Sequence, residues 1–427
     1  MSRLRHAGFV LADAVKGMPM GMHMKRLHSA FADEAMARSY RELLLSKLIS
    51  HALSEVPYYS QFAGAKSLQD FPVLQKRTVQ DRYADFLSKG FSTSMYVEKN
   101  TSGSYGTPIT FRLTRDQVSK TSAELVFFNR WAGYYPGMRH IYFSHVKQAG
   151  LRTFVQNETV IYPGRMGEAW LQDTVQKIRQ PGIEFVIAAP SVLANIWHYC
   201  LHNRVSLKGL LKGIIIISEP CPEELRHDLM FFFGCPVHGR YACTEFGVIA
   251  HQCLETYHVN PLEHIVEILD IDTDGPCKPG VPGRVVVTGL SNMAMPLIRY
   301  DTGDLAIRGE ECICGRKGMT LTAVIGRQVE KIYATHGDSV LPFVLWSRIQ
   351  YFPGILQYQF VQSSQMDYEL RLRVAPGFAH FADCEVALRA LLGEDARVVA
   401  REVHEIESLP SGKRPLVINS WKKSDGR

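Results

Sequence analysis

Two stretches of this sequence carry hydroxyl, carboxylate and glycine residues in an arrangement suited to a nucleotide. Residues 100–108 read Asn-Thr-Ser-Gly-Ser-Tyr-Gly-Thr-Pro, and the N–H and O–H donors of such a turn can surround phosphate oxygens. No Gly-Lys-Ser/Thr follows, so this is not a Walker loop, and an ordinary surface hairpin is the alternative. Residues 241–247 read Tyr-Ala-Cys-Thr-Glu-Phe-Gly. Tyr241, Thr244 and Glu245 could stack a base, bind a phosphate and hold magnesium, or Glu245 could be a solvated side chain at a strand end.

Three further short motifs follow along the chain. Residues 299–304 read Arg-Tyr-Asp-Thr-Gly-Asp, and the Asp304 carboxylate can accept hydrogen bonds from two ribose hydroxyls. Residues 325–327 read Ile-Gly-Arg and precede a change in composition, and residues 409–413 end with Lys413 on a glycine turn. Each motif is weak alone, but their order and spacing together are specific.

This order of motifs resembles the adenylate-forming ligases, and within them the branch of phenylacetate–coenzyme A ligase and capsule-locus ligase-like proteins. The resemblance to the branch rests on five segments and covers about residues 50–420. These segments are residues 56–59 (Val-Pro-Tyr-Tyr), 71–76 (Phe-Pro-Val-Leu-Gln-Lys), 101–108, 294–300 (Ala-Met-Pro-Leu-Ile-Arg-Tyr) and 312–316 (Cys-Ile-Cys-Gly-Arg).

The resemblance implies an AMP-forming acid–thiol ligase that works in two steps. A carboxylate attacks the α-phosphorus of MgATP to give an acyl-adenylate and pyrophosphate, and a thiol then attacks the activated carbonyl. Coenzyme A is the expected acceptor. An aromatic or other hydrophobic acid is the expected substrate, because residues 141–145, 215–217 and 241–242 are largely apolar or aromatic. An amine or carrier-protein thiol as acceptor, and a decayed protein that only binds nucleotide, remain alternatives.

The same resemblance implies a role for individual residues. The ATP phosphates would be held by Thr101, Ser102, Gly103, Ser104 and Gly106, and the adenine side would be formed by Ser218, Glu219, Pro220, Tyr241 and Ala242. Thr244 would contact the α-phosphate, Glu245 would hold magnesium, Asp304 would bind the ribose with Arg327 beside it, and Lys413 would reach the reacting oxygens. The chain departs from the usual pattern at Tyr105, Ala242 and Asp301, and its phosphate loop has no lysine.

Three of the nine cysteines and one histidine could share a metal ion. Cys253, His258, Cys312 and Cys314 offer sulfur and imidazole ligands suited to tetrahedral zinc, and some members of the resembling branch bind structural zinc in this region. Four metal-free groups are the alternative. The remaining cysteines have no predicted role; they are Cys200, Cys221, Cys235, Cys243, Cys277 and Cys384.

The periodicity of apolar residues predicts the elements that position these motifs. Residues 1–95 are expected to be helical with loops, including residues 30–53. Strands are predicted at 141–143, 184–187, 213–217 and 236–238, with helices at 168–178, 191–202 and 222–233 between them. Strands then dominate at 265–269, 283–288 and 305–307, and the last 95 residues combine strands at 358–362, 368–374 and 397–403 with a helix at 384–392.

These patterns predict an α/β protein with two domains. Residues 1–326 would form a large adenylation domain with a helical lead-in (1–95), an α/β part (96–260) and a β-rich subdomain (261–326). Residues 327–331 would be a hinge that contains Glu330, and residues 332–427 a small mobile α+β cap. In the resembling family this cap rotates between the two half-reactions.

Composition adds the remaining expectations. The chain has 427 residues, with 48 Lys and Arg against 42 Asp and Glu, and this net charge of +6 is too small to indicate a nucleic-acid partner. Nine cysteines spread over this length do not form a secreted disulfide framework, and no apolar run reaches the ~18 residues of a membrane span. The protein is therefore expected to be cytoplasmic, and a homodimer is left open.

Overall fold

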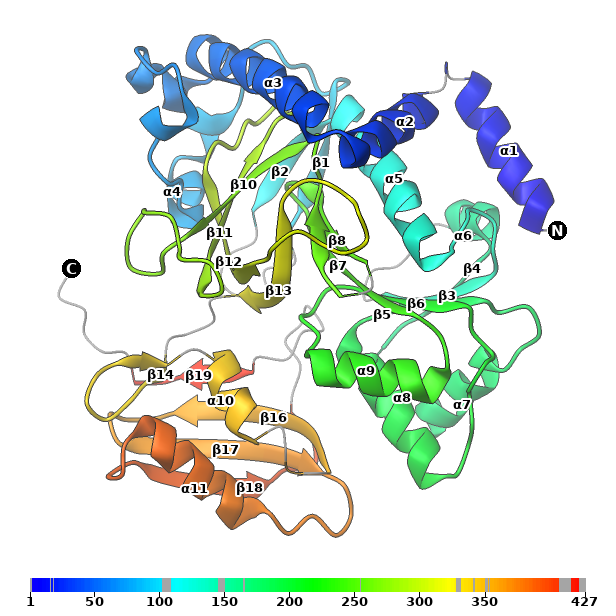
Figure 1. Ribbon diagram of the computed structural model, residues 1–427, viewed down its shortest axis with the longest axis vertical. Helices are drawn as coiled ribbons and strands as arrows, with labels where there is room; N and C mark the ends of the chain where they lie inside the picture. The colour runs from blue at the N-terminus through cyan, green and yellow to red at the C-terminus, as the bar shows by residue number, and fades with distance from the viewer. Residues whose placement is uncertain are drawn as a thin grey trace. The chain divides into compact units, whose positions relative to one another are not determined.

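The computed structural model divides the chain into two compact units, Met1–Gly326 and Arg327–Arg427, which are described separately. It describes residues 2–15, 17, 19–101, 109–144, 150–163, 166–253, 255–327, 332–340, 342–349, 352, 354–406 and 416–421. Figure 1 shows helices and sheets in both units, so the predicted α/β fold class is confirmed.

The first unit begins with helices. They are α1 (Ser2–Val15), α2 (Pro19–Ala32) and α3 (Glu34–Glu55), followed by the short α4 (Lys76–Asp81) and the 3-10 turns η1 (Pro57–Phe62), η2 (Leu68–Asp70) and η3 (Tyr83–Phe86). The helical segment predicted over residues 30–53 is divided at Asp33, which caps α3 by accepting a 3.1 Å hydrogen bond from the Met36 amide. Residues from α3 to η3 then pack into the same apolar core as the later strands.

A parallel half-sheet forms the α/β part of this unit. Its strands are β3 (His140–Phe143), β4 (Glu158–Ile161), β5 (Phe185–Ala188), β6 (Gly213–Ile216) and β7 (Val237–Cys243), in the spatial order β4-β3-β5-β6-β7. The connections are α6 (Gly150–Gln156), α7 (Glu168–Ile178), α8 (Pro190–His202) and α9 (Glu223–Phe233), as in successive βαβ units (Figure 1). Because these strands are buried on both faces, they are continuous apolar runs such as the four isoleucines of residues 214–217.

Antiparallel strands extend the same sheet beyond β7. They are β8 (Gly247–Gln252), β9 (Tyr257–Val259), β13 (Thr320–Arg327), β12 (Tyr300–Arg308), β11 (Pro282–Gly289) and β10 (His264–Leu269), in that spatial order. The segment predicted as a β-rich subdomain is therefore continuous with the α/β part through one sheet of 11 strands. This continuity fixes the distance between motifs on β7 and motifs on β12.

A two-stranded hairpin and a long helix complete the first unit. The hairpin pairs β1 (Tyr96–Asn100) with β2 (Thr110–Thr114), and α5 (Arg115–Asn129) follows at once, continued by the turn η4 (Arg130–Ala132). Thr114 caps α5 by accepting a hydrogen bond from the Gln117 amide (3.2 Å). At the tip of the hairpin, Thr101 and Ile109 are joined by two hydrogen bonds, one backbone and one through the Thr101 hydroxyl.

The second unit contains two small sheets and two helices. β14 (Ile332–Tyr333) pairs with β15 (Ser339–Val340), and a four-stranded sheet has the order β18 (Arg397–Glu402), β17 (Asp367–Val374), β16 (Ile355–Gln362), β19 (Val417–Asn419). Helices α10 (Pro342–Ile349) and α11 (Phe381–Leu392) contribute to its own apolar core. The unit is thus an α+β module with a separate core.

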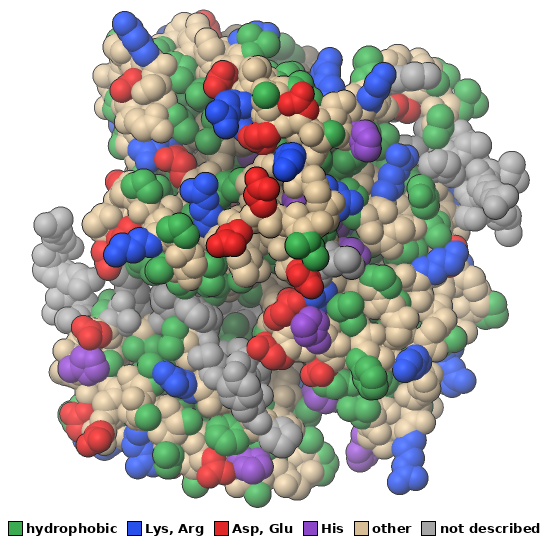
Figure 2. All heavy atoms as spheres, viewed as in Figure 1, with side chains coloured by type: hydrophobic (Ala, Val, Ile, Leu, Met, Phe, Trp, Pro, Cys, Tyr) green, Lys and Arg blue, Asp and Glu red, His purple; other side chains and the backbone are tan. Residues whose placement is uncertain are grey.

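The surface carries charges of both signs. Figure 2 shows basic and acidic side chains interspersed over the face drawn. None of the helices in the described part of the chain has the length and apolar character required to cross a lipid bilayer.

Candidate functional site

The turn between β7 and β8 carries the motif of residues 241–247. Gly247 begins β8 with φ 76°, and a Cβ atom there would lie 2.5 Å from the Thr121 hydroxyl on α5, so only glycine fits. The Gln117 side-chain amide donates to the Glu245 carbonyl (3.0 Å) and ties the turn to α5. Glu245 is only 8% exposed, so the alternative of a solvated glutamate is wrong.

Tyr241 and Asp304 are brought together from strands 63 residues apart. The Tyr241 hydroxyl donates to Asp304 Oδ2 over 2.7 Å. The Thr302 hydroxyl lies 3.3 Å from the Tyr241 hydroxyl. The Asp304 amide donates to Thr302 Oγ1 (3.1 Å), which fixes the turn. Burial, followed by the Asp304 charge, raises the pKa of Tyr241 well above its usual value, so the phenol remains a hydrogen-bond donor.

The unusual Asp301 has a structural partner. Arg284 of β11 donates to Asp301 Oδ2 (2.9 Å), and both side chains are largely buried. Asp301 Oδ1 accepts from the Gly303 amide (2.9 Å), so the same carboxylate holds the backbone of the turn that presents Asp304. Asp301, which departs from the usual residue at this position, therefore stabilises the turn of residues 301–304.

The loop after β6 meets the end of β13. Ser218 has φ 71°, a strained backbone conformation for a residue with a side chain, and Glu219 accepts a 3.3 Å hydrogen bond from the Ser191 amide at the start of α8. A Cβ atom on Gly326 would lie 2.7 Å from Pro220 Cγ. Pro220 and Gly326 are thus in close contact, which places the Ser-Glu-Pro loop beside the Ile-Gly-Arg motif.

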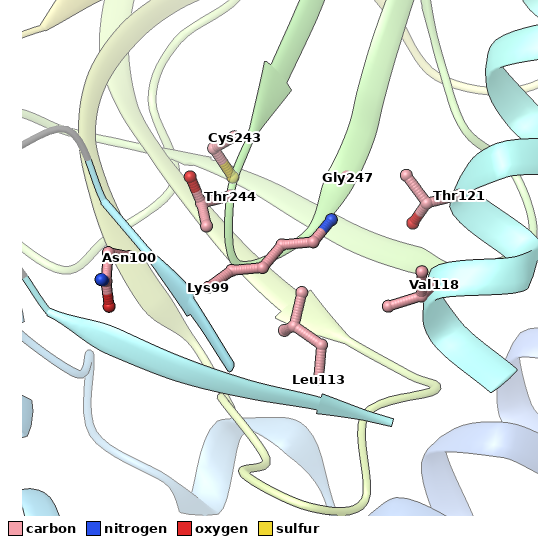
Figure 3. A pocket seen from close by; sticks show the side chains of 8 residues that line it. All are labelled: Lys99, Asn100, Leu113, Val118, Thr121, Cys243, Thr244 and Gly247. Carbon is pink, nitrogen blue, oxygen red and sulfur yellow. The ribbon is translucent and has the colours of Figure 1, made fainter. Parts of the chain in front are cut away.

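A cavity of about 300 Å³ opens beside the 241–247 turn. Its lining residues come from the hairpin, from α5 and from the turn: Lys99, Asn100, Leu113, Val118, Thr121, Cys243, Thr244 and Gly247. Figure 3 shows the Lys99 side chain extending across the cavity toward Gly247. Thr244 and Asn100 lie near the backbone end of this side chain. Among the described residues, one ammonium group and two hydroxyls but no carboxylate line this space, a composition that suits an anion.

Several predicted site residues lie outside this description. Ser102, Gly103, Ser104, Gly106 and Lys413 are not among the described residues, nor is Glu330 of the predicted hinge. Arg327 is the last residue of β13, but its side chain is not described. Ala242 is described and exposed beside Tyr241. Their roles therefore remain predictions.

The four predicted metal ligands converge. Cys253 follows β8, His258 lies in β9, and Cys312 and Cys314 lie in the loop between β12 and β13. One ligand atom from each residue lies within 4.8 Å of the others, with 3.5 Å between the sulfurs of Cys253 and Cys312 and 3.2 Å between Cys314 Sγ and His258 Nε2. None of these thiols forms a disulfide.

The donors in this cluster suit a soft divalent cation. Burial, followed by the nearby Arg316 charge, lowers the pKa of His258 to about 4, so its imidazole is neutral at physiological pH. For Cys314, burial acts to raise the pKa, but hydrogen bonds and charge from Arg316 outweigh it and the pKa is lowered. Arg316 itself lies over the Trp131 ring at 4.1 Å. Burial raises the pKa of Cys312 to about 11, so this thiol would lose its proton only on binding a metal. Three sulfur ligands and one neutral imidazole in one partly buried group fit zinc.

Sequence reasoning missed two basic residues beside the predicted motifs. Lys99 immediately precedes the phosphate loop, and Arg240 immediately precedes Tyr241. Their proximity to the motifs in sequence was the only signal, because neither belongs to the pattern that carries the resemblance. Thr121, which approaches Gly247 from α5, gave no signal because the contact joins residues 126 positions apart.

The chain is similar in sequence to known adenylate-forming proteins. Residues 151–295 match the family model described as AMP-binding enzyme. The chain is 25% identical to "Phenylacetate-coenzyme A ligase" of Thermus thermophilus over 88% of this chain and 93% of that protein. It is 21% identical to "Protein CapK" of Staphylococcus aureus over 87% of this chain and 86% of that protein. The predicted resemblance is confirmed: the chain matches the AMP-binding enzymes, and the curated proteins it is similar to are phenylacetate–coenzyme A ligases and CapK.

Solved structures agree on the fold. A crystal structure of 2-hydroxyisobutyryl-CoA ligase in the postadenylation state superposes with TM-score 0.72 and 16% identity, over 89% of this chain and 88% of that one. The anthranilate CoA ligase AuaEII in complex with anthranoyl-AMP gives TM-score 0.55 and 13% identity, over 74% of this chain and 65% of that one. The fold is therefore that of the adenylate-forming ligases.

Proposed function

We propose that this protein activates a carboxylic acid with ATP as an acyl-adenylate and transfers the acyl group to coenzyme A. The observation that carries the proposal is the hydrogen bond between Tyr241 and Asp304, beside a cavity that Thr244 lines. It joins the nucleotide motifs of β7 and β12 in one place. The names of the relatives, which include phenylacetate–coenzyme A ligases, support the thiol acceptor.

The described residues suit the nucleotide in the first step. The Tyr241 ring would stack near adenine, and its hydroxyl orients Asp304 so that the second carboxylate oxygen can accept from a ribose hydroxyl. The Thr244 hydroxyl lines the cavity and would donate to the α-phosphate. Positioning of this kind brings the carboxylate and phosphorus together, which is a large part of what such a reaction requires.

Negative charge accumulates when a carboxylate meets a phosphate, and cations must offset it. The buried Glu245 carboxylate would hold Mg²⁺, which neutralises phosphate charge when bound. The Lys99 ammonium is part of the cavity wall that Thr244 also lines. We assign Lys99 to the phosphate oxygens, where it would compensate for the lysine that the loop of residues 100–108 does not have.

Lys413 would act in adenylation only. If the second unit rotates about residues 327–331, Lys413 would leave after the first half-reaction and the thiol would then approach. Lys413→Ala is expected to abolish pyrophosphate exchange and to leave thioester formation from preformed acyl-adenylate largely intact. Equal loss of both steps would contradict this role.

Pyrophosphate exchange against a panel of acids tests the function directly. Exchange with at least one acid, followed by coenzyme A-dependent thioester formation, is the expected result. Exchange without thioester formation would favour an amine or carrier-protein thiol as acceptor. ATP binding without exchange for any acid would favour a decayed nucleotide-binding protein.

We also propose that Cys253, His258, Cys312 and Cys314 hold one structural zinc ion. The convergence of their ligand atoms within 4.8 Å supports this proposal, as does the buried His258 Nδ1, which has no partner among the described residues and could bond a water or a neighbouring group. The ion would join the end of β8, strand β9 and the β12–β13 loop. Metal analysis of the purified protein tests it, with about one zinc per chain expected.

The cellular setting is also part of the proposal. All nine cysteines are free thiols, which supports a reducing, cytoplasmic environment. A homodimer remains a prediction that size-exclusion chromatography with light scattering would test.

A further inference from the structure

One partly buried arginine, Arg240, lies among the residues expected to contact the acid. Across the parallel sheet, Tyr142, Ile187, Ile215 and His238 are direct neighbours on β3, β5, β6 and β7. Side chains of directly paired residues point to the same face of a sheet, so these four share one face. Arg240 follows His238 by two residues and therefore points to that face too, while Tyr241 points to the other.

This face is apolar around Arg240. Tyr142, Ile187, Ile215 and Ile217 pack with Tyr134, Phe185, Ala132 and Met138 in one cluster. Residues 141–145, 215–217 and 241–242 are the segments that the sequence assigns to the acyl pocket. Arg240 is thus a cation at the carboxyl end of β7, beside the predicted wall of that pocket, where ligands of α/β sheets commonly bind.

The guanidinium has an incomplete set of partners. Its Nη2 atom donates to Asn129 Oδ1 at the end of α5 (2.5 Å), and its buried Nε has no hydrogen-bond partner among the described residues. No ion pair with a carboxylate is recorded for Arg240 within the described part of the chain. Withdrawing even part of a charged group from water without an opposite charge is costly, and an anion that enters from outside would offset this cost.

The described neighbours of Arg240 do not supply the missing anion. His251, directly opposite Arg240 on β8, is fully buried with both ring nitrogens unpartnered, and burial holds its pKa well below the usual value, so it is neutral. Tyr142 and Tyr134 lie near the guanidinium but carry no carboxylate, and His238 Nδ1 donates to the Gln252 carbonyl (2.9 Å). Burial lowers the pKa of Arg240 to about 10, which leaves it charged at neutral pH.

We infer that Arg240 binds a second anionic group on the tail of the acid, for which a carboxylate is the best fit. This inference rests on the proposed function and replaces a purely apolar substrate by an acid with an apolar middle and an anionic end. The planar guanidinium can donate two parallel hydrogen bonds to a carboxylate. Arg240 is four residues from Thr244, so the acid would span at most about 13 Å between its two ends.

Matched pairs of acids test this inference. Pyrophosphate exchange is measured with hexanoate against adipate and with phenylacetate against 4-carboxyphenylacetate. The wild-type chain is expected to prefer the dicarboxylic member of at least one pair. Arg240→Met is expected to lower kcat/KM for that member by about 10- to 100-fold, without a comparable loss for the monocarboxylic acid. Arg240→Lys should retain part of the preference.

Arg139→Met is the matched control. Arg139 precedes β3, and its guanidinium is satisfied by the Pro181 carbonyl and the Gln180 side chain, so this variant removes the same charge elsewhere in the unit. Its acid preference should equal that of the wild type. Preference of the wild-type chain for the apolar member of both pairs, or an equal loss for all acids in Arg240→Met, would overturn the inference.

Direct binding separates this inference from the proposed function. Calorimetry with adipate and hexanoate in the presence of AMP requires no turnover, and wild-type affinity for adipate should exceed that of Arg240→Met by about 10-fold or more. If no acid supports pyrophosphate exchange, the proposed function fails. The inference about Arg240 is then still decided by whether Arg240→Met lowers the affinity for adipate. A further measurement with 4-hydroxyphenylacetate tests whether a neutral polar tail binds as well as an anionic tail. If the enzyme prefers 4-hydroxyphenylacetate to 4-carboxyphenylacetate, the inference of an anionic tail is contradicted.

Discussion

Strand β8 has a candidate site at each of its ends, and the two differ in how much space the protein leaves beside the polar groups. At Gly247 the turn faces a cavity of about 300 Å³ lined by an ammonium group and hydroxyls. At Gln252 the chain enters a group of four proposed metal ligands whose ligand atoms lie within 4.8 Å of one another. The first arrangement leaves room for a ligand that comes and goes, and the second leaves room only for an ion.

This difference predicts which property a substitution at each end of β8 should change. A closed metal site joins segments that are distant in sequence, so its loss should lower stability. An open site whose groups wait for a substrate contributes to rate and affinity instead. The two effects should therefore separate, even though only the six residues of β8 lie between the two sites.

The largest expected effect is on stability at the metal end. Cys312→Ser should remove zinc, and the free energy of unfolding should fall by about 4 kcal/mol if zinc is present at ~1,000 times its dissociation constant. Zinc content and thermal unfolding measure this change. Cys277→Ser, which removes a thiol outside the cluster, is the control. Unchanged stability after complete loss of zinc would contradict the conclusion that this end of β8 contributes to stability.

The next effect is on rate at the nucleotide end. Glu245→Gln should lower the pyrophosphate-exchange rate by about 100-fold, because a neutral amide replaces the carboxylate proposed to hold Mg²⁺ beside the phosphates. Zinc content should stay the same. The control is Glu255→Gln, an exposed glutamate near the other end of β8. A comparable loss of rate in the control would show that the two ends are not independent.

A smaller effect is expected at the cavity wall. Lys99→Met should raise KM for ATP by about 10-fold with little change in KM for the acid, since it removes one charge-assisted hydrogen bond to phosphate. Lys99→Arg should restore most of the affinity. Steady-state kinetics measure both variants, and Lys47→Met, on the exposed face of α3, controls for the change in net charge. An unchanged KM for ATP would remove Lys99 from the site.

The smallest effect concerns the orientation of Asp304. Tyr241→Phe keeps the aromatic ring and deletes the 2.7 Å hydrogen bond to Asp304, so ATP affinity should fall by a factor of about 2 to 10. Nucleotide titration measures it, with Tyr135→Phe in an exposed turn as the control. A gain in affinity would mean that the hydrogen bond competes with ribose binding.

Local elements were predictable because their causes are local. The strands at 141–143 and 213–217 and the helix at 168–178 follow from apolar periodicity, and the structure has β3, β6 and α7 there. The division between α2 and α3 at Asp33 was missed, since apolar spacing continues across the cap. The continuity of residues 261–326 with the main sheet was also missed, because strand pairing is set by contacts between distant residues.

The candidate site was predictable in its chemistry and only partly in its membership. The order of motifs identified Tyr241, Thr244, Glu245 and Asp304, and the structure brings Tyr241 and Asp304 into contact. Lys99 and Arg240 gave no such signal, because the role of a basic side chain depends on the groups that surround it in the folded protein. The Asp301 departure was understood only when Arg284 was found beside it.

The sequence by itself determined the class of chemistry, since hydroxyl, carboxylate and lysine residues in a fixed order specify what a nucleotide site can do. It also determined the local elements, because these depend on residues within a few positions of one another. Only the tertiary structure decided that Cys253 and Cys312, 59 residues apart, lie 3.5 Å from each other. It alone also decided that Arg240 is partly buried with no carboxylate beside it among the described residues, because burial and charge pairing depend on the packing of segments that are distant along the chain.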